Sequence, residues 1–120
     1  MKVQQGDIYW IDLGEPKGSE PGYRRPFVIV QNDVFNQSRL KTVVVCALTS
    51  NLRLSESPGN VFIKKGIANL PKDSVVNITQ LITVDEMDFE DKIGTLPFSL
   101  IHKIIDGLNL LLNPVDDFNV

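Results

Sequence analysis

The chain has 120 residues, a formal net charge of −3 and an apolar content of 42%, which predicts one ordinary globular domain spanning residues 1–120. Its single cysteine, Cys46, excludes an intrachain disulfide. The N-terminal residues lack the apolar core of a secretory signal, and no apolar run approaches the about 20 residues that span a bilayer. We therefore expect a cytoplasmic protein with no membrane segment.

Charge is distributed unevenly along the chain. Residues 1–53 hold seven basic and five acidic residues, whereas residues 54–120 hold five lysines and ten acidic residues. All four arginines lie in the first half, and arginine makes better bidentate contacts with phosphate than lysine does. The sequence thus permits an anion site in the N-terminal half, without the strong basic footprint of a general RNA-binding domain.

The predicted elements, in chain order, are mostly strands. Alternating or continuous apolar runs rich in β-branched and aromatic residues predict strands at residues 7–13, 26–31, 42–48, 61–63 and 74–81. The run at 42–48 is apolar throughout, which favours a central strand covered on both faces.

The connecting segments are polar. Residues 14–22 form a loop dense in glycine and proline, and loops of this length in compact domains are often functional. Residues 32–41 hold a short helical turn near 34–37, residues 51–60 form a second loop, and the acidic segment 85–91 is expected to be a weakly helical connector.

A C-terminal helix is predicted from Pro97 to Asn113-Pro114, because proline suits the first helical position and a later proline ends the helix. Apolar residues at helical spacing predict its buried face: Ile101, Ile104, Ile105, Leu108 and Leu111 or Leu112. The predicted fold class is mostly β with a C-terminal helix, as a small, strongly bent antiparallel sheet or partial barrel.

Several kinds of chemistry are excluded. The one histidine, His102, falls on the polar side of the predicted helix, so a pair of catalytic histidines is impossible and a Ser-His-Asp triad is not indicated. The acidic run at 85–91 lacks the alternating ligands and central glycine of a calcium loop, which favours a solvated face. The sequence holds no glycine-rich phosphate-binding motif. We therefore predict no metal and no cofactor.

Three features remain as candidates for chemistry. Arg25-Pro26 follows the long loop, Thr49-Ser50-Asn51 ends the apolar strand, and Gln80 is a neutral amide in a largely apolar strand. Each also has a structural interpretation, since hydroxyl and amide residues commonly begin turns. An amide is equally suited to reading a base edge.

Together, these pieces resemble the opening and later signatures of MazF/PemK-type toxins. The matching segments run in the family's order from about residue 5 to 112: Gly6-Asp7-Ile8-Tyr9-Trp10-Ile11-Asp12-Leu13, Gly18-Ser19-Glu20, Arg25-Pro26, Gln31-Asn32-Asp33, Leu48-Thr49-Ser50-Asn51, Leu70-Pro71-Lys72-Asp73-Ser74-Val75, Gln80, Thr83-Val84-Asp85 and Gly94-Thr95-Leu96-Pro97.

The resemblance implies a homodimer of small SH3-like barrels that binds single-stranded RNA across its interface. It implies attack of a 2′-OH on the adjacent phosphate, which leaves a 2′,3′-cyclic phosphate and a 5′-OH. Arg25 and Thr49 match the catalytic pair, and an antitoxin segment is implied to occupy the RNA groove. The residues implied to line that groove are Ser19, Glu20, Asn32, Ser50, Asn51 and Gln80, to which Arg24 is added because it neighbours Arg25.

This chain departs from the family pattern at three positions. Ile82 stands where many members have an arginine, and Asn77 and Thr79 stand where Kid-type members have an arginine and an aspartate. The Arg25 and Thr49 pair is therefore the preferred catalytic set. Because arginine has a pKa above about 12, Arg25 is expected to stabilise charge, while an acid or base role stays open.

Two alternatives remain. One is a gyrase poison of the CcdB kind, which carries a Trp-Gly-Ile C-terminus where this chain ends Phe118-Asn119-Val120. The other is an inactive family member that only binds RNA or an antitoxin.

Overall fold

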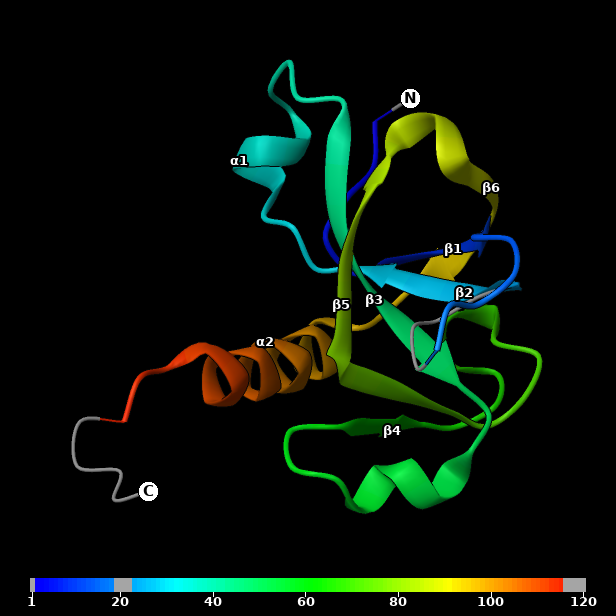
Figure 1. Ribbon diagram of the computed structural model, residues 1–120, viewed down its shortest axis with the longest axis vertical. Coiled ribbons are helices and arrows are strands. Elements are labelled where there is room, and N and C mark those ends of the chain that lie inside the picture. Colours follow the sequence, from blue (N-terminus) through cyan, green and yellow to red (C-terminus); the bar gives the residue numbers. More distant parts are fainter. Residues whose placement is uncertain (1, 19–22, 116–120) are drawn as a thin grey trace.

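A computed structural model describes residues 2–18 and 23–115 (Figure 1). Six antiparallel strands form one curled sheet in the order β4-β5-β3-β2-β1-β6. The strands are β1 (Asp7–Asp12), β2 (Arg24–Ile29), β3 (Thr42–Thr49), β4 (Val61–Ile63), β5 (Ser74–Asp85) and β6 (Phe89–Thr95). The helices are α1 (Asp33–Asn36) and α2 (Phe98–Leu112), with 3₁₀ turns η1 (Leu52–Glu56), η2 (Ile67–Asn69) and η3 (Glu86–Asp88). The predicted fold class, mostly β with a C-terminal helix, is confirmed.

The sheet curls because its longest strand, β5, is bent. Cys46 on β3 faces Leu81, but Leu48, two residues on, faces Val76. The additional β5 residues at this step form an irregularity of the kind that bends a strand and increases its twist. Figure 1 shows β5 passing from the upper half of the sheet to the lower half beside β4. The sheet therefore has two halves, each with its own apolar core.

Strand β3 contributes to both cores. Cys46 and Leu48 pack in the core beneath α2, whereas Val45 and Ala47 pack in the core of the curled half that holds β1, β2 and β6. All four side chains are at most 2% exposed, which confirms the prediction of a central strand covered on both faces.

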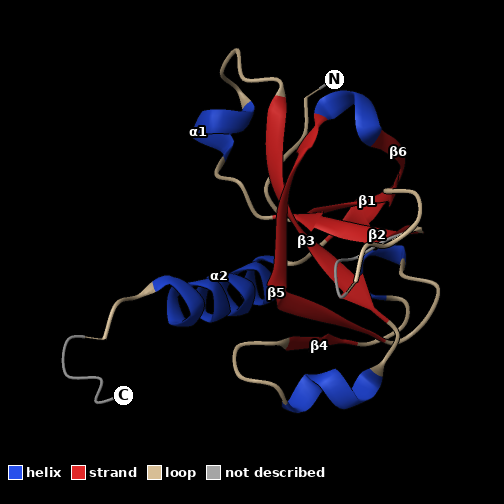
Figure 2. Cartoon of the chain, in the orientation of Figure 1, coloured by secondary structure: helices blue, strands red, loops and turns tan. Residues whose placement is uncertain are grey.

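Helix α2 closes the first core with only part of its length. Ile104, Gly107 and Leu108 are buried, and a Cβ atom at Gly107 would lie 2.2 Å from the carbonyl oxygen of Gly59, so glycine allows the helix to approach this loop. The prediction that Leu111 or Leu112 is buried is wrong, because these residues are 42% and 65% exposed. The helix extends past the sheet in Figure 2.

The weakly helical connector predicted at 85–91 is confirmed only over η3. Its last part is wrong, because β6 begins at Phe89 and pairs with β1. Glu90, Asp91 and Lys92 are charged, so the sequence of this segment does not look like a strand. Charged residues are nevertheless common on edge strands such as β6, because they discourage pairing with other chains. Strand β2 begins at Arg24, two residues before the predicted start, and its ladder to β3 begins at Phe27.

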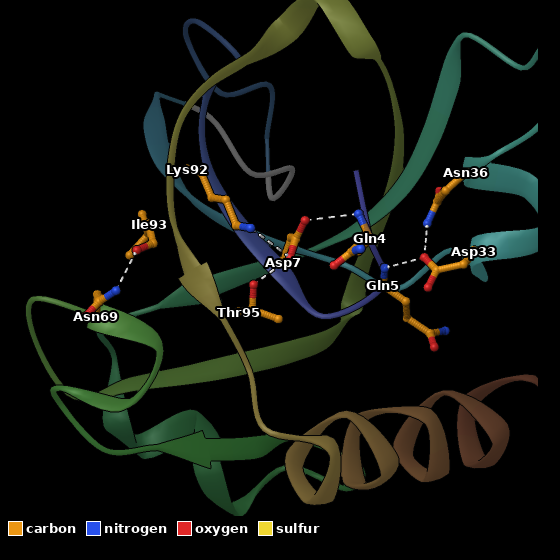
Figure 3. Close-up of polar contacts among 9 residues, drawn as sticks. All are labelled: Gln4, Gln5, Asp7, Asp33, Asn36, Asn69, Lys92, Ile93 and Thr95. Atoms are coloured by element: carbon orange, nitrogen blue, oxygen red, sulfur yellow. Dashed lines mark hydrogen bonds and ion pairs between the residues drawn. The ribbon is translucent and has the colours of Figure 1, made fainter. Parts of the chain in front are cut away.

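A buried carboxylate fastens the N-terminal segment to β6 (Figure 3). Asp7, 1% exposed, accepts hydrogen bonds from the Gln4 backbone N–H at 3.0 Å and the Thr95 hydroxyl at 2.7 Å. The Lys92 ammonium lies 3.4 Å from the same carboxylate. We call these four residues the Asp7 cluster.

Within the described residues, no helix is long and apolar enough to cross a membrane.

Candidate functional site

Four strand ends meet at one edge of the sheet and form a pocket. Strands β1 and β3 end there, and β2 and β5 begin there, because neighbouring strands run antiparallel. The pocket has a volume of about 340 Å³. Its lining residues are Trp10, Arg24, Arg25, Pro26, Leu48, Thr49, Ser50, Pro71, Lys72 and Ser74.

The register of the sheet brings Arg25 to Thr49. The paired ladder between β2 and β3 begins at Phe27 and Ala47, and Arg25 and Thr49 lie two residues beyond these partners, one on each strand. Both side chains line the pocket. Arg25 is half-buried, as is Thr49. The two residues predicted to be catalytic therefore lie side by side in the pocket.

The Thr49 hydroxyl is oriented by the turn that follows it. The backbone N–H of Asn51 donates to Thr49 Oγ1 at 3.1 Å, so the oxygen acts as an acceptor there and keeps its own proton to donate elsewhere. Asn51 itself is the N-cap of η1, and its side-chain oxygen accepts from the Arg53 N–H at 3.3 Å. Asn51 thus positions the turn, while Ser50 lines the pocket directly.

Arg24 is held on two sides. Its Cζ atom lies 4.3 Å from the centre of the Trp10 ring, and its Nε donates to Glu90 Oε1 at 2.7 Å. The Arg24 and Glu90 side chains are 44% and 42% exposed, so the ion pair contributes little to stability. It does fix where the guanidinium lies.

The pocket is cationic although the chain is acidic. Of the described residues that line it, Arg24, Arg25 and Lys72 are basic and none is acidic. Guanidinium groups, an ammonium group and hydroxyl donors suit an anionic ligand such as a phosphate. In the described parts of the chain, no group of three or more His, Cys, Asp or Glu side chains comes together to hold a metal.

Two predicted RNA-binding residues lie away from this pocket in the single chain. Asn32 follows the far end of β2, and its side chain caps α1 by accepting from the Val34 N–H at 2.8 Å. Gln80 lies on β5 five residues beyond Val75, the residue that faces Thr49. Two others, Ser19 and Glu20, lie outside the described residues.

The residues that replace the Kid-type pair belong to a different cavity. The Thr79 hydroxyl donates to the Asn77 side-chain oxygen at 3.2 Å, and both residues line a space of about 540 Å³ beside Leu110 and Leu111. Ile82 packs against the core of the curled half. His102 is exposed and makes an edge-to-face contact with Phe98 at 4.3 Å between ring centres.

Sequence reasoning missed Trp10, Lys72, Ser74 and Glu90. Trp10 and Ser74 fall in predicted strands and Lys72 in a predicted turn, and nothing in the sequence indicates that β1 ends and β5 begins beside Arg25. Glu90 belongs to the acidic segment 85–91, whose sequence predicts a solvated face. The available signal was the position of Trp10, four residues before the start of the long loop that leads to Arg24.

The fold and the site define a small curled-sheet protein with a cationic pocket at its strand ends. A family model described as PemK-like, MazF-like toxin of type II toxin-antitoxin system matches residues 4–112. The chain belongs to this family. It is 44% identical over 113 residues to Endoribonuclease MazF6 of Mycobacterium tuberculosis, covering 94% of this chain and 99% of the relative. It is 33% identical over 116 residues to Endoribonuclease EndoA of Bacillus subtilis, covering 97% and 99% of the two chains.

Solved structures show the same fold. An endoribonuclease in complex with its cognate antitoxin, from a mycobacterial species, matches with a TM-score of 0.76 at 24% identity, covering 94% of this chain and 98% of that chain. MazF from Deinococcus radiodurans matches with a TM-score of 0.76 at 19% identity, covering 95% and 99%. The predicted family and bent antiparallel barrel are confirmed. The enzyme class predicted from the sequence is confirmed through the family's curated relatives, which are named endoribonucleases.

Proposed function

We propose that this protein is a sequence-specific, metal-independent endoribonuclease and the growth-arresting toxin of a toxin–antitoxin pair. Its substrate is single-stranded RNA, and one domain spanning residues 1–120 performs the reaction in the cytoplasm. The observation that carries the proposal is that Arg25, at the start of β2, and Thr49, at the end of β3, line one pocket whose described lining holds no acidic residue.

The chemistry follows from where charge develops. The ribose 2′-OH gives up its proton as its oxygen bonds to the adjacent phosphorus. The bond to the 5′-oxygen breaks and that oxygen takes up a proton, which leaves a 2′,3′-cyclic phosphate and a 5′-OH. Negative charge gathers on the non-bridging oxygens in the transition state. Arg25 supplies a permanent positive charge there, and one such donor contributes about 3 kcal/mol. Thr49 supplies a second donor because its oxygen already accepts from Asn51.

The remaining RNA contacts are assigned by position. Arg24 and Ser50 line the pocket, and Asn51 follows directly. Asn32 and Gln80 contact RNA in this proposal only if the RNA extends well beyond the pocket or the groove is shared with a second chain. Ser19 and Glu20 belong to the loop that precedes Arg24 and are proposed from the family pattern alone.

A second copy of this chain is the proposed partner in a homodimer. The end of α2 exposes Leu110 at 62%, Leu111 at 42% and Leu112 at 65%, and Phe62 nearby on β4 is 45% exposed. Leu110 and Phe62 line one open cavity together. An apolar surface at the end of a helix is typical of a protein–protein contact. Leu110→Glu is expected to give a monomer in sedimentation experiments, whereas Met87→Glu, at an exposed site on η3, leaves the dimer intact.

The proposed neutraliser is an antitoxin protein that occupies the RNA groove. Support comes from the family, whose description names type II toxin–antitoxin systems, and from the solved relative in complex with its cognate antitoxin. An acidic or extended peptide in the cationic pocket would exclude RNA by competition.

The test is cleavage of a long single-stranded RNA in EDTA by the wild-type protein and by Arg25→Ala. Discrete fragments with 5′-OH ends from the wild type alone support the proposal and define the recognition sequence. Intact RNA with a folded, dimeric wild-type protein contradicts it, and a gyrase assay then tests the CcdB-like alternative. A growth phenotype that Thr49→Ala leaves untouched favours an inactive, RNA- or antitoxin-binding member.

A further inference from the structure

We propose that Arg24, stacked on Trp10 and fixed by Glu90, forms a platform on which one base of the RNA stacks next to the cleaved phosphate. The base that stacks best there contributes to the sequence preference. This inference rests on the proposed function, because it assumes that RNA enters the pocket of Arg25 and Thr49.

Three strands build the platform. Strand β1 pairs Trp10 with Pro26 and Asp12 with Arg24, so Trp10 and Arg24 are diagonal neighbours on one face of the sheet, within reach for long side chains. Strand β6, on the other side of β1, supplies Glu90 next to Phe89, which pairs with Ile11. The Arg24 guanidinium therefore contacts the indole of Trp10 on β1 and the carboxylate of Glu90 on β6.

The two contacts leave a defined part of the guanidinium for a ligand. One face lies over the indole at 4.3 Å, and the Nε edge is taken by Glu90 at 2.7 Å. Because the side chain remains 44% exposed, a large part of it is open to a ligand. A guanidinium plane of this kind stacks on nucleobases.

The ion pair decides between a base and a phosphate as the ligand of Arg24. A carboxylate at 2.7 Å offsets much of the positive charge that a phosphate would otherwise attract, whereas it leaves the flat face of the guanidinium unchanged. Lys72 lines the same pocket, and its ammonium group suits a phosphate but offers no planar face for stacking. Since Trp10 and Arg24 also line this pocket, the stacked base belongs to a nucleotide beside the cleaved phosphate.

The platform can be monitored directly because Trp10 is the only tryptophan of the chain. The probe is a single-stranded RNA that contains the mapped cleavage site and carries a 2′-O-methyl group there, so that it binds without being cut. Binding is expected to change the Trp10 fluorescence of the wild type. Replacing the bases next to the cleavage site one at a time by abasic sites is expected to weaken binding about ten-fold at a single position, the usual size of a base–aromatic stacking contribution.

The decisive variant is Arg24→Lys, which keeps the positive charge and removes the planar group. We expect it to bind intact RNA about ten-fold more weakly and to be insensitive to the abasic site at the platform position, with Arg24→Gln behaving alike. Wild-type affinity for Arg24→Lys, or an unchanged abasic profile, overturns the proposal. Circular dichroism verifies that each variant is folded.

Glu90→Gln tests the positioning role of Glu90. We expect a several-fold rise in KM, little change in kcat and a flatter abasic profile, while the thermal unfolding midpoint stays near that of the wild type. Unchanged KM and profile contradict this role. If Arg25→Ala abolishes cleavage while the Arg24 and Glu90 variants behave as the wild type, only the platform fails. Uncleaved RNA with the wild type itself removes the proposed function instead.

Discussion

The Asp7 cluster and the Arg25 pocket both gather polar side chains from distant segments, but they use them in opposite ways. In the Asp7 cluster a carboxylate that is 1% exposed receives two hydrogen bonds and faces an ammonium group, so its acceptor capacity is consumed by the protein (Figure 3). In the pocket, the Thr49 hydroxyl accepts one internal bond and keeps its proton, and it lies with three basic side chains around an open space. Saturated polar groups stabilise a fold, whereas groups with remaining capacity bind a ligand.

The largest expected effect comes from removing the charge in the pocket. Arg25→Ala should lower the cleavage rate at saturating RNA by about 100-fold or more, because one donor to the developing charge contributes about 3 kcal/mol. The cleavage rate of Arg25→Lys should lie between those of the wild type and Arg25→Ala, since an ammonium group keeps the charge but not the bidentate geometry. Single-turnover cleavage in EDTA measures both. A loss of less than ten-fold for Arg25→Ala would place the catalytic charge elsewhere.

In the Asp7 cluster the expected effect is on stability. Asp7→Asn removes the charge that faces Lys92, and its amide NH2 must lie opposite either the Gln4 N–H or the Lys92 ammonium group, neither of which can accept a hydrogen bond. We expect a loss of about 2 kcal/mol in the free energy of unfolding, measured by urea titration. The cleavage rate of the folded variant should match the wild type. A large rate loss without destabilisation would show that the two regions are coupled.

The Thr49 hydroxyl should contribute less than the Arg25 charge because it is a neutral donor. Thr49→Val, which has nearly the same shape, should lower the rate about ten-fold, and Thr49→Ser should retain most of it. Rates measured with the same RNA and buffer provide the comparison. Equal activity of the valine and serine variants would indicate that the hydroxyl donates nothing to the transition state.

The smallest effect is expected at Cys46, which belongs to neither region. Burial raises the pKa of its thiol to about 12, so at pH 8 the native protein should react negligibly with iodoacetamide, while the unfolded chain reacts readily. An unfolded thiol titrates near 9 and the folded one near 12. The unfolded state therefore loses this proton first, and the contribution of Cys46 to stability is complete below pH 9 and falls as the pH rises from 9 to 12. Mass spectrometry after timed alkylation checks the reactivity, and rapid modification at pH 8 would contradict it.

Strongly patterned segments were predictable because their signal is local. The continuous apolar run of β3 indicated a strand buried on both faces, and helical spacing around Ile104 and Leu108 indicated one face of α2. The end of α2 and strand β6 were not predictable, because the burial of Leu111 and the pairing of Phe89 depend on where other elements lie. The charged residues of β6 do not look like a strand in the sequence, and the apolar residues at the end of α2 look buried. Only the arrangement of the other elements shows otherwise.

The site divides in the same way. The sequence alone determined the family, the bent β fold with its C-terminal helix, and the choice of Arg25 and Thr49, because ordered motifs carry this information along the chain. Only the tertiary structure decided that Arg25 and Thr49 line one pocket, that Trp10 and Glu90 hold Arg24, and that Asn32 caps a helix outside the pocket. Strand register and the bend in β5 set these neighbours, and both arise from pairing between residues far apart in sequence, which local patterns do not encode.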